Sequence, residues 1–391
     1  MPHLRRLALL ALVAVLCAPA STARAEDADT PVDTPVFMQS ARIPVKIVEG
    51  KLIVTCDVST AFRRIPVNLF VELETPAGLQ LHNQAANGIR AENRDGTPNP
   101  ITIHLPDLDI KVPTREHGPT KVYDDFTKFH SPKIGEIALV GTIGMEVLKQ
   151  YHLVLDLGNG LMVLSAPKSE MDGEPADADG VSRLRITTRN DLAWCPVNRE
   201  DGSPAVMALG TAAYDTVIDE IVCYETGRPA GDIGGVTLGD FDLAKYVAFR
   251  PEEIALAHPD GALGTIGLNV LEHFRVEVDR VNRWVTFQQT KAPEFPEADL
   301  AFFRARAEED GDAMQAFLDE HAKTRLGREA ASLLVDLRLE EDAPADTFKQ
   351  AVTWVNDTQD EDVRATVMLD LMKVLSDAGR EDYVLMAGEV G

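Results

Sequence analysis

Cysteine is scarce in this chain of 391 residues, which has only four. Beyond the first 25 positions the cysteines are Cys56, Cys195 and Cys223, so at most one internal disulfide can form. The chain is therefore not a scaffold held by disulfides, and its fold must rest on a hydrophobic core. The spacing of the three cysteines leaves open whether any two of them are bonded.

Spacings typical of metal and cofactor sites are also missing. None of the nine histidines lies in a ligand pattern such as H-E-x-x-H, and the sequence contains no C-x-x-C pair. The nucleophile motif G-x-S-x-G and the phosphate-binding loop G-x-x-x-x-G-K-[ST] are absent as well. The sequence thus predicts neither a metal site nor a cofactor.

Positive charge is in short supply. Lysine and arginine number 38 against 63 acidic residues, which gives a formal net charge of −25. Nucleic acid and anionic membrane surfaces are therefore poor partners for this chain. After the N-terminal segment no apolar run is long enough to span a bilayer, so we expect no membrane insertion of the mature chain.

The first 25 residues have the pattern of a secretory signal peptide. Arg5 and Arg6 precede the apolar run Leu7–Cys17, and Ala23-Arg24-Ala25 forms an A-x-A cleavage site. We expect cleavage near Ala25 and export of the mature protein, to a periplasm or to the outside of the cell.

Composition and periodicity divide the rest of the chain into segments. Hydrophobic residues make up 45% of the sequence, enough for more than one domain with a core. Short apolar runs of strand type alternate with turns up to Gln289, and the later residues have helical spacing. We expect a flexible lead-in (26–42), a β lobe 1 (43–167), a linker (168–183), a β lobe 2 (184–289) and an α-helical domain (297–391).

The two lobes contain a repeated sequence. "GTIGMEVLKQYHLVLDLGN" begins at Gly141 and "GTIGLNVLEHFRVEVDRVN" begins at Gly264, and the two align without a gap. Each copy predicts a glycine turn, a short helix and two strands. The shared apolar spacing indicates an internal duplication.

An earlier pair of segments also corresponds. "VELETPAG" (Val71 to Gly78) aligns with "MALGTAAY" (Met207 to Tyr214), and each reads as a strand followed by a turn. In this ungapped alignment Glu74 matches Gly210, and Thr75 matches Thr211.

The order of these elements resembles that of the retropepsin-like aspartic proteases, here in two fused copies. "GTAAYDTVI" (Gly210 to Ile218) resembles the D-T-G-A segment of that family, and Thr265 to Asp279 resembles its later glycine and helix element. The resemblance covers about residues 43–289. It implies two β-barrel lobes of the acid-protease fold, with the helical domain outside the resemblance.

In that family each lobe supplies one aspartate, and the two carboxyls share a proton. The threonine after each aspartate binds the main chain of the opposite lobe. Carried over to this chain, the threonines are Thr75 and Thr211, but the carboxylate positions hold Glu74 and Gly210. The dyad is therefore degenerate, and the resemblance argues against peptide hydrolysis of the family type.

Two interpretations of Asp215 are open. It stands where the family often holds the backbone of an extended substrate, and it also fits as a cap on the turn "DTVID". We predict a protein that binds extended peptide or protein in the inter-lobe cleft, near Thr75, Thr211 and Asp215, without cutting it. One alternative is an active aspartic-type endopeptidase with a displaced acid pair, using Glu74 with Asp215 or Asp219. Another is a structural platform whose helical tail binds the partner.

Overall fold

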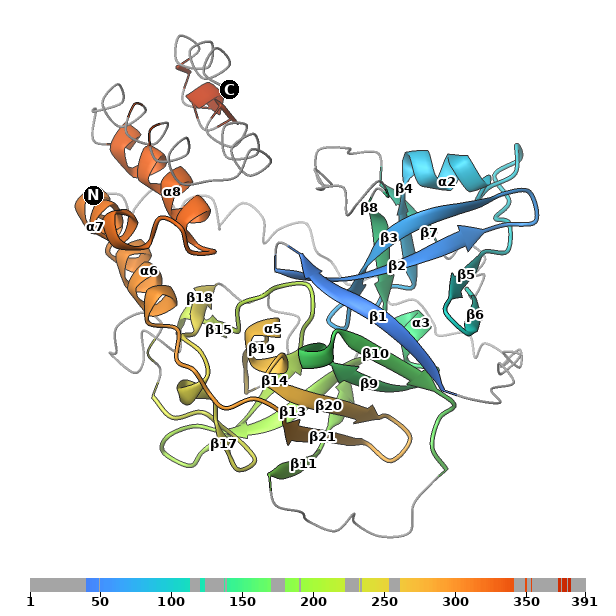
Figure 1. The fold of residues 1–391 in the computed structure, drawn as a ribbon, viewed down its shortest axis with the longest axis horizontal. Coiled ribbons are helices and arrows are strands. Elements are labelled where there is room, and N and C mark those ends of the chain that lie inside the picture. Colours follow the sequence, from blue (N-terminus) through green and yellow to red (C-terminus); the bar gives the residue numbers. More distant parts are fainter. Residues whose placement is uncertain are drawn as a thin grey trace, which may run out of the picture. The chain divides into compact units, whose positions relative to one another are not determined.

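The computed structural model describes residues 40–48, 50–112, 120–123, 137, 139–169, 180–189, 191–221, 232, 234–252, 261–340, 349, 353, 372–373, 375–377 and 379–380 (Figure 1). The chain divides into Met1–Pro35 and Val36–Gly391, and all described residues belong to the second unit. The expected signal peptide, nearly all of the lead-in, Cys223 and most of the chain after residue 340 lie outside the described residues.

A connecting sheet contains strands from both copies of the repeat. Its order is β11-β21-β20-β9-β10-β1, and all neighbouring strands in it are antiparallel. These strands are β1 (Ala41–Val48), β9 (His152–Asp156), β10 (Leu161–Ser165), β11 (Val181–Arg185), β20 (Phe274–Asp279) and β21 (Trp284–Gln289). Three therefore come from each copy, and β9 and β20 meet in the middle (Figure 1).

The register of β9 and β20 follows an internal symmetry. Val154 pairs with Glu277, and these two residues are separated by 123 positions, the offset between Gly141 and Gly264. An antiparallel pair centred on equivalent residues is unchanged by a half-turn. A local pseudo-two-fold axis thus passes between Val154 and Glu277.

Each lobe has further strands of its own. Lobe 1 contains β2 (Lys51–Ser59), β3 (Arg64–Glu72), β4 (Leu79–His82), β5 (Thr102–Leu105), β6 (Leu108–Lys111), β7 (Thr120–Tyr123), β8 (Leu139–Gly144) and the helices α2 (Asn83–Ile89) and α3 (Met145–Leu148). Lobe 2 contains β12 (Thr187–Arg189), β13 (Leu192–Asn198), β14 (Pro204–Leu209), β15 (Val217–Asp219), β16 (Thr237–Leu238), β17 (Phe241–Asp242), β18 (Arg250–Glu252), β19 (Ala262–Ile266) and the helix α5 (Leu268–Leu271). β3 in lobe 1 and β14 in lobe 2 each lead into the loop that faces the other lobe. Each runs parallel to the strand that carries the G-T-I-G motif, β3 to β8 and β14 to β19.

Close backbone contacts explain the repeated glycines. A Cβ atom at Gly141 would lie 2.1 Å from the carbonyl oxygen of Gln80, and one at Gly264 would lie 1.9 Å from that of Val217. No side chain fits at either distance, so both copies need glycine where the neighbouring strand, β4 or β15, pairs with the motif. The motif that reveals the duplication is therefore a packing requirement of each lobe.

Three described helices follow the lobes: α6 (Glu297–Glu308), α7 (Gly311–His321) and α8 (Gly327–Glu340). Asp310 caps α7 by accepting a hydrogen bond from the N–H of Asp312. Phe302, Phe303 and other apolar residues form a core separate from that of the lobes, and Ala248 of lobe 2 belongs to this second core. The helices thus bury their own apolar faces and also pack against lobe 2.

The fold class predicted from the sequence is confirmed, because the described chain is mostly β and carries its longer helices at the C-terminal end. In the part of the chain that the structure describes, no helix combines the length and the hydrophobicity required to cross a membrane.

Candidate functional site

The lobes meet through the loops that follow β3 and β14, and Thr211 joins them. Its buried hydroxyl donates a hydrogen bond of 2.6 Å to the carbonyl oxygen of Val71 and accepts one of 3.1 Å from the N–H of Leu73. Thr211 therefore holds the main chain of the opposite lobe. Thr75 makes a local contact instead, since its hydroxyl donates to Glu72 Oε2 at 2.7 Å within lobe 1.

The strand pairing defines which residues of the two loops are equivalent. Val71 pairs with Ile143 in lobe 1, and Leu209 pairs with Ile266 in lobe 2. Ile143 and Ile266 occupy the same place in the repeated G-T-I-G motif. Val71 and Leu209 are consequently equivalent strand ends.

This equivalence shifts the predicted correspondence by two residues. Glu72 follows Val71, as Gly210 follows Leu209, so Glu72 rather than Glu74 is the counterpart of Gly210. A shift of two residues keeps every side chain of a strand on the same face. The apolar pattern therefore fits both registers. The ungapped sequence alignment corresponds to the register that matches Glu74 with Gly210, and the structure has the one that matches Glu72 with Gly210.

The Glu74 carboxyl group crosses from lobe 1 to lobe 2. Its Oε2 accepts the N–H of Thr211 at 2.8 Å, and its Oε1 accepts the N–H of Ala212 at 2.7 Å. The residue as a whole is half-buried, but its carboxyl end is enclosed. This desolvation raises the pKa of Glu74 above its ordinary value of 4.5, and the N–H donors of Thr211 and Ala212 oppose part of the rise.

The absent side chain at Gly210 leaves room for this carboxyl group. A Cβ atom at Gly210 would lie 2.3 Å from Thr265 Cγ2 and 3.2 Å from Glu74 Oε1. Any larger residue at this position has to displace Thr265, and it also crowds Glu74. Position 210 therefore carries no carboxylate, and a side chain there would need Thr265 to move.

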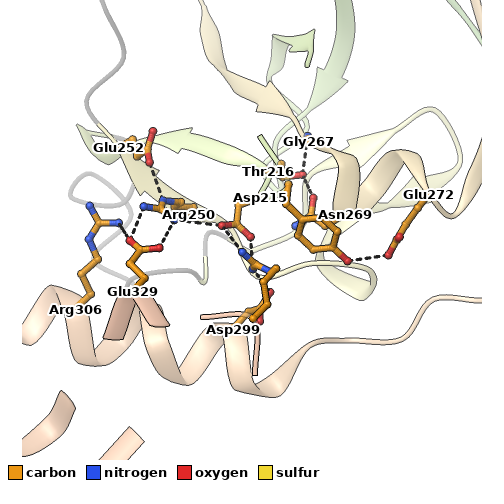
Figure 2. A network of polar contacts seen from close by, with 12 residues as sticks. Asp215, Thr216, Arg250, Glu252, Gly267, Asn269, Glu272, Asp299, Arg306 and Glu329 are labelled. Carbon is orange, nitrogen blue, oxygen red and sulfur yellow. Dashed lines mark hydrogen bonds and ion pairs between the residues drawn. The ribbon is translucent and has the colours of Figure 1, made fainter. Parts of the chain in front are cut away.

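Asp215 lies almost wholly buried in an ion-pair network (Figure 2). Its side chain is 5% exposed, and its two oxygens contact Arg325 at 2.5 and 3.2 Å and Arg250 at 3.3 Å. Arg325 also contacts Asp299 at 2.9 Å. Since Arg325 follows α7 and Asp299 lies on α6, Asp215 ties lobe 2 to the helical domain.

Arg250 forms a second connection of the same kind. Its guanidinium binds both oxygens of Glu329 on α8, at 2.7 and 2.9 Å, and its Nε donates to Glu252 at 2.7 Å (Figure 2). A bidentate arginine–carboxylate pair fixes orientation as well as distance. These carboxylates raise the pKa of Arg250 against the opposing effect of its burial, so its charge is secure.

A cavity of about 540 Å³ lies beside this network. Its walls come from the turn between β1 and β2, the loop after β14, strand β18 and the turn between α7 and α8. The lining residues are Gly50, Lys51, Ala212, Ala213, Tyr214, Asp215, Val217, Arg250, Glu252, Lys323, Thr324, Arg325, Leu326, Arg328 and Glu329. The guanidinium of Arg325 stacks over the ring of Tyr214 at 4.6 Å.

The acids proposed for a displaced pair are engaged elsewhere. Asp215 is bound by two arginines, and Asp219 Oδ1 accepts the N–H of Ile221. Within the described residues no hydrogen bond joins either aspartate to Glu74. The acidic side chain whose negative charge contributes to the raised pKa of Glu74 is that of Glu72, two residues earlier in the chain.

Sequence reasoning did not single out Glu72, Arg250 or Arg325 as site residues. Glu72 could have been found by aligning the loops backward from the G-T-I-G motif with a gap allowed. Arg250 and Arg325 gave no such signal, because each lies in a segment without periodicity and pairs with residues far away in the sequence.

No protein-family model matches the sequence, and no curated protein sequence matches it. Among solved structures the chain is similar to an aspartic proteinase from Irpex lacteus, with a TM-score of 0.39 and 11% identity over 65% of this chain and 98% of that chain. The strand pairing and the hydrogen bonds above define the two lobes independently of this likeness.

Proposed function

We propose that the protein is an exported, retropepsin-like binding protein that holds extended peptide segments without hydrolysing them. One observation carries the proposal. At the contact between the lobes, both oxygens of Glu74 accept main-chain N–H groups of lobe 2, and Gly210 provides no second carboxylate.

Peptide hydrolysis by two carboxyls needs one of them to accept a proton from water and the other to donate one to the peptide. Glu74 has its oxygens directed at Thr211 and Ala212, and these hydrogen bonds also connect the lobes. The oxygens that a catalytic base would direct at a water are thus already used to connect the lobes. Glu72, the true counterpart of Gly210, accepts the hydroxyl of Thr75 and likewise has no acidic counterpart in lobe 2 at Gly210.

Binding requires less than catalysis does. An extended peptide can pair its backbone with the main chain of a cleft wall, and side-chain pockets then select among peptides. The loop Ala212–Asp215 lines the cavity, and the N–H groups of Ala213 and Asp215 donate to no acceptor in the described part of the chain. Because the Asp215 carboxylate is already bound by arginines, the main chain of this loop is the better partner for a peptide.

One observation favours the structural platform as a second candidate function. The network of Asp215, Arg250 and Arg325 fastens the helices to lobe 2, as a platform would need. In that case a partner would contact residues of the helical domain only. Hydrogen exchange of the protein with a partner bound separates the two functions, because peptide binding protects the loop 212–217 and a platform leaves it unchanged.

The test of the proposal combines binding and cleavage in one sample. Mature protein is incubated with fluorescein-labelled unfolded casein and with a peptide library from pH 3 to pH 8. We expect a rise in anisotropy with no new fragments in the mass spectrum, and the same result for Glu74→Gln. Cleavage that disappears in Glu74→Gln would show an active enzyme with a displaced acid pair and would overturn the proposal.

Export is tested separately. The N-terminal peptide of protein isolated from its native cell should begin near Glu26, after removal of residues 1–25. A chain that retains Met1 and stays inside the cell contradicts the proposed location without touching the binding function.

A further inference from the structure

The cavity beside Asp215 is lined by more basic than acidic side chains, although the whole chain is strongly acidic. Its lining contains five basic side chains, Lys51, Arg250, Lys323, Arg325 and Arg328, against the three acids Asp215, Glu252 and Glu329. The whole chain has a net charge of −25. A local excess of cations within such an acidic protein attracts an anionic group to this cavity in particular.

The acids in the lining are already committed. Asp215 binds Arg250 and Arg325, and Glu252 and Glu329 both bind Arg250. All three therefore neutralise two arginines that hold the helical domain on lobe 2. Lys51 and Lys323 also line the cavity and lie outside this set of ion pairs.

Two of those cations approach the cavity from different parts of the fold. Lys51 begins β2 in lobe 1, and Lys323 lies in the turn between α7 and α8. Within the described residues neither lysine has an acidic partner, and Lys51 rests on the ring of Phe70 at 4.6 Å. An anion in the cavity would supply the missing partner to lobe 1 and to the helical domain at once.

The remaining lining indicates what bears the anion. Ala212, Ala213, Val217 and Leu326 provide apolar surface, and the ring of Tyr214 lies among them. A volume of about 540 Å³ falls within the usual range of about 300–1,000 Å³ for ligand sites. Apolar walls, main-chain donors and unpaired lysines together fit a peptide with aliphatic residues and a carboxylate.

We propose that this cavity, built by lobe 1, lobe 2 and the helical domain, binds a carboxylate of an extended peptide. The inference rests on the proposed function and adds the chemical class of the ligand. The carboxylate can come from an acidic side chain or from the peptide's C-terminus, and Lys51 and Lys323 bind it in either case.

The experiment measures fluorescence anisotropy of the full mature protein with three fluorescein-labelled hexapeptides at low salt. The first alternates valine with glutamate and has an amidated C-terminus. The second has glutamine for glutamate, and the third is the glutamine peptide with a free C-terminal carboxylate. We expect the charged peptides to bind about 10-fold more tightly than the neutral one, since a charge-assisted hydrogen bond contributes more than a neutral one. The order of the first and third peptides distinguishes a side chain from the C-terminus as the source.

Variants test whether the cavity is responsible. Lys51→Gln and Lys323→Gln should each weaken the charged peptides by roughly 5-fold and leave the neutral peptide unchanged. Arg304→Gln, an exposed change on α6 that removes the same charge outside the cavity, is the matched control and should have no effect. Unchanged thermal unfolding of each variant excludes a loss of fold.

Two results would overturn the inference in different ways. Equal affinity for the glutamate, free-acid and neutral peptides, or an equal loss in Arg304→Gln, removes the carboxylate site and leaves peptide binding intact. No binding of any of the peptides removes the proposed function and this inference together.

Discussion

Gly210 of lobe 2 and the carboxyl group of Glu74 of lobe 1 are close neighbours at the contact between the lobes. The position after β14 has no side chain, and the carboxyl of Glu74 enters from lobe 1 to accept the two N–H groups beside it. A substitution at either residue therefore alters the packing or the hydrogen bonds of the other. Gly210 is constrained by the space around it, because a Cβ there would meet Thr265 Cγ2 at 2.3 Å.

Gly210→Ala should destabilise the protein by about 1–3 kcal/mol, as expected for overpacking in a filled site. Thr265→Ser removes the obstructing Cγ2 atom and keeps the hydroxyl, so it should recover most of that loss in the double variant. The free energy of unfolding of the four chains, measured with denaturant, gives the coupling between the two positions.

Gly235→Ala provides the control, because a Cβ at Gly235 would meet nothing closer than 4.0 Å. It should change the free energy of unfolding by less than about 1 kcal/mol. Additive effects of Gly210→Ala and Thr265→Ser would mean that Thr265 is not what excludes a side chain from position 210.

Among the secondary-structure elements, those with a strong sequence pattern were predictable. The repeated G-T-I-G motif located β8, β19 and the short helices after them, because its glycines meet a close backbone crossing in each lobe. The loop after β3 was placed in the wrong register, since a strand pattern of period two fits a shift of two residues equally well. The turn between α7 and α8 could not be placed at all, because no local pattern indicates that Arg325 reaches Asp215 across 110 residues.

That turn attaches the helices to lobe 2 mainly through Asp215. Asp215→Ala leaves Arg250 and Arg325 without their shared buried partner, and removal of one member of a buried ion pair costs about 3–5 kcal/mol. We expect faster hydrogen exchange throughout α6, α7 and α8, and little change in β9 and β20. Native-state hydrogen exchange followed by mass spectrometry measures both regions in one experiment.

Glu252→Ala is the matched control on the same network. Glu252 binds the same Arg250, but its side chain is 43% exposed, so its loss should cost less than about 1 kcal/mol. Equal exchange of the helices in Asp215→Ala and in the unaltered protein would show that the Arg250–Glu329 pair and the apolar contact with Ala248 hold the helical domain without Asp215.

At the scale of the whole molecule, two carboxylates contribute to the contacts between the lobes. The fold raises the pKa of one of them and lowers the pKa of the other. Glu74 lies at the loop contact, and burial raises its pKa. Glu277 lies on the pseudo-two-fold axis of the connecting sheet, where its side chain accepts a hydrogen bond from His152 of lobe 1 at 3.0 Å and also pairs with Lys168. The hydrogen bond from His152 and the nearby charge of Lys168 lower the pKa of Glu277 from 4.5 to about 2.

The signs of these shifts predict opposite responses to acid. A lowered pKa contributes stability that is present above the ordinary value of 4.5 and is lost as the pH falls through about 2. Glu277→Gln should thus destabilise the protein by about 1–3 kcal/mol at pH 7, after allowance for solvent screening, and by progressively less below pH 4.5. A raised pKa contributes stability that is full below 4.5 and is lost as the pH rises through the folded-state value, so the cost of Glu74→Gln should be greatest in acid.

Denaturant unfolding at intervals from pH 3 to pH 8 tests these two pH dependences. The chains compared are the wild type, Glu74→Gln, Glu277→Gln and the exposed control Glu294→Gln. The two difference curves should slope in opposite directions with pH, while that of Glu294→Gln stays flat. If the curves for Glu74→Gln and Glu277→Gln run parallel, the two carboxylates do not hold the lobes in the manner described. Opposite slopes would instead mean that acid weakens the connecting sheet while the loop contact strengthens, so the lobes would first separate at β9 and β20.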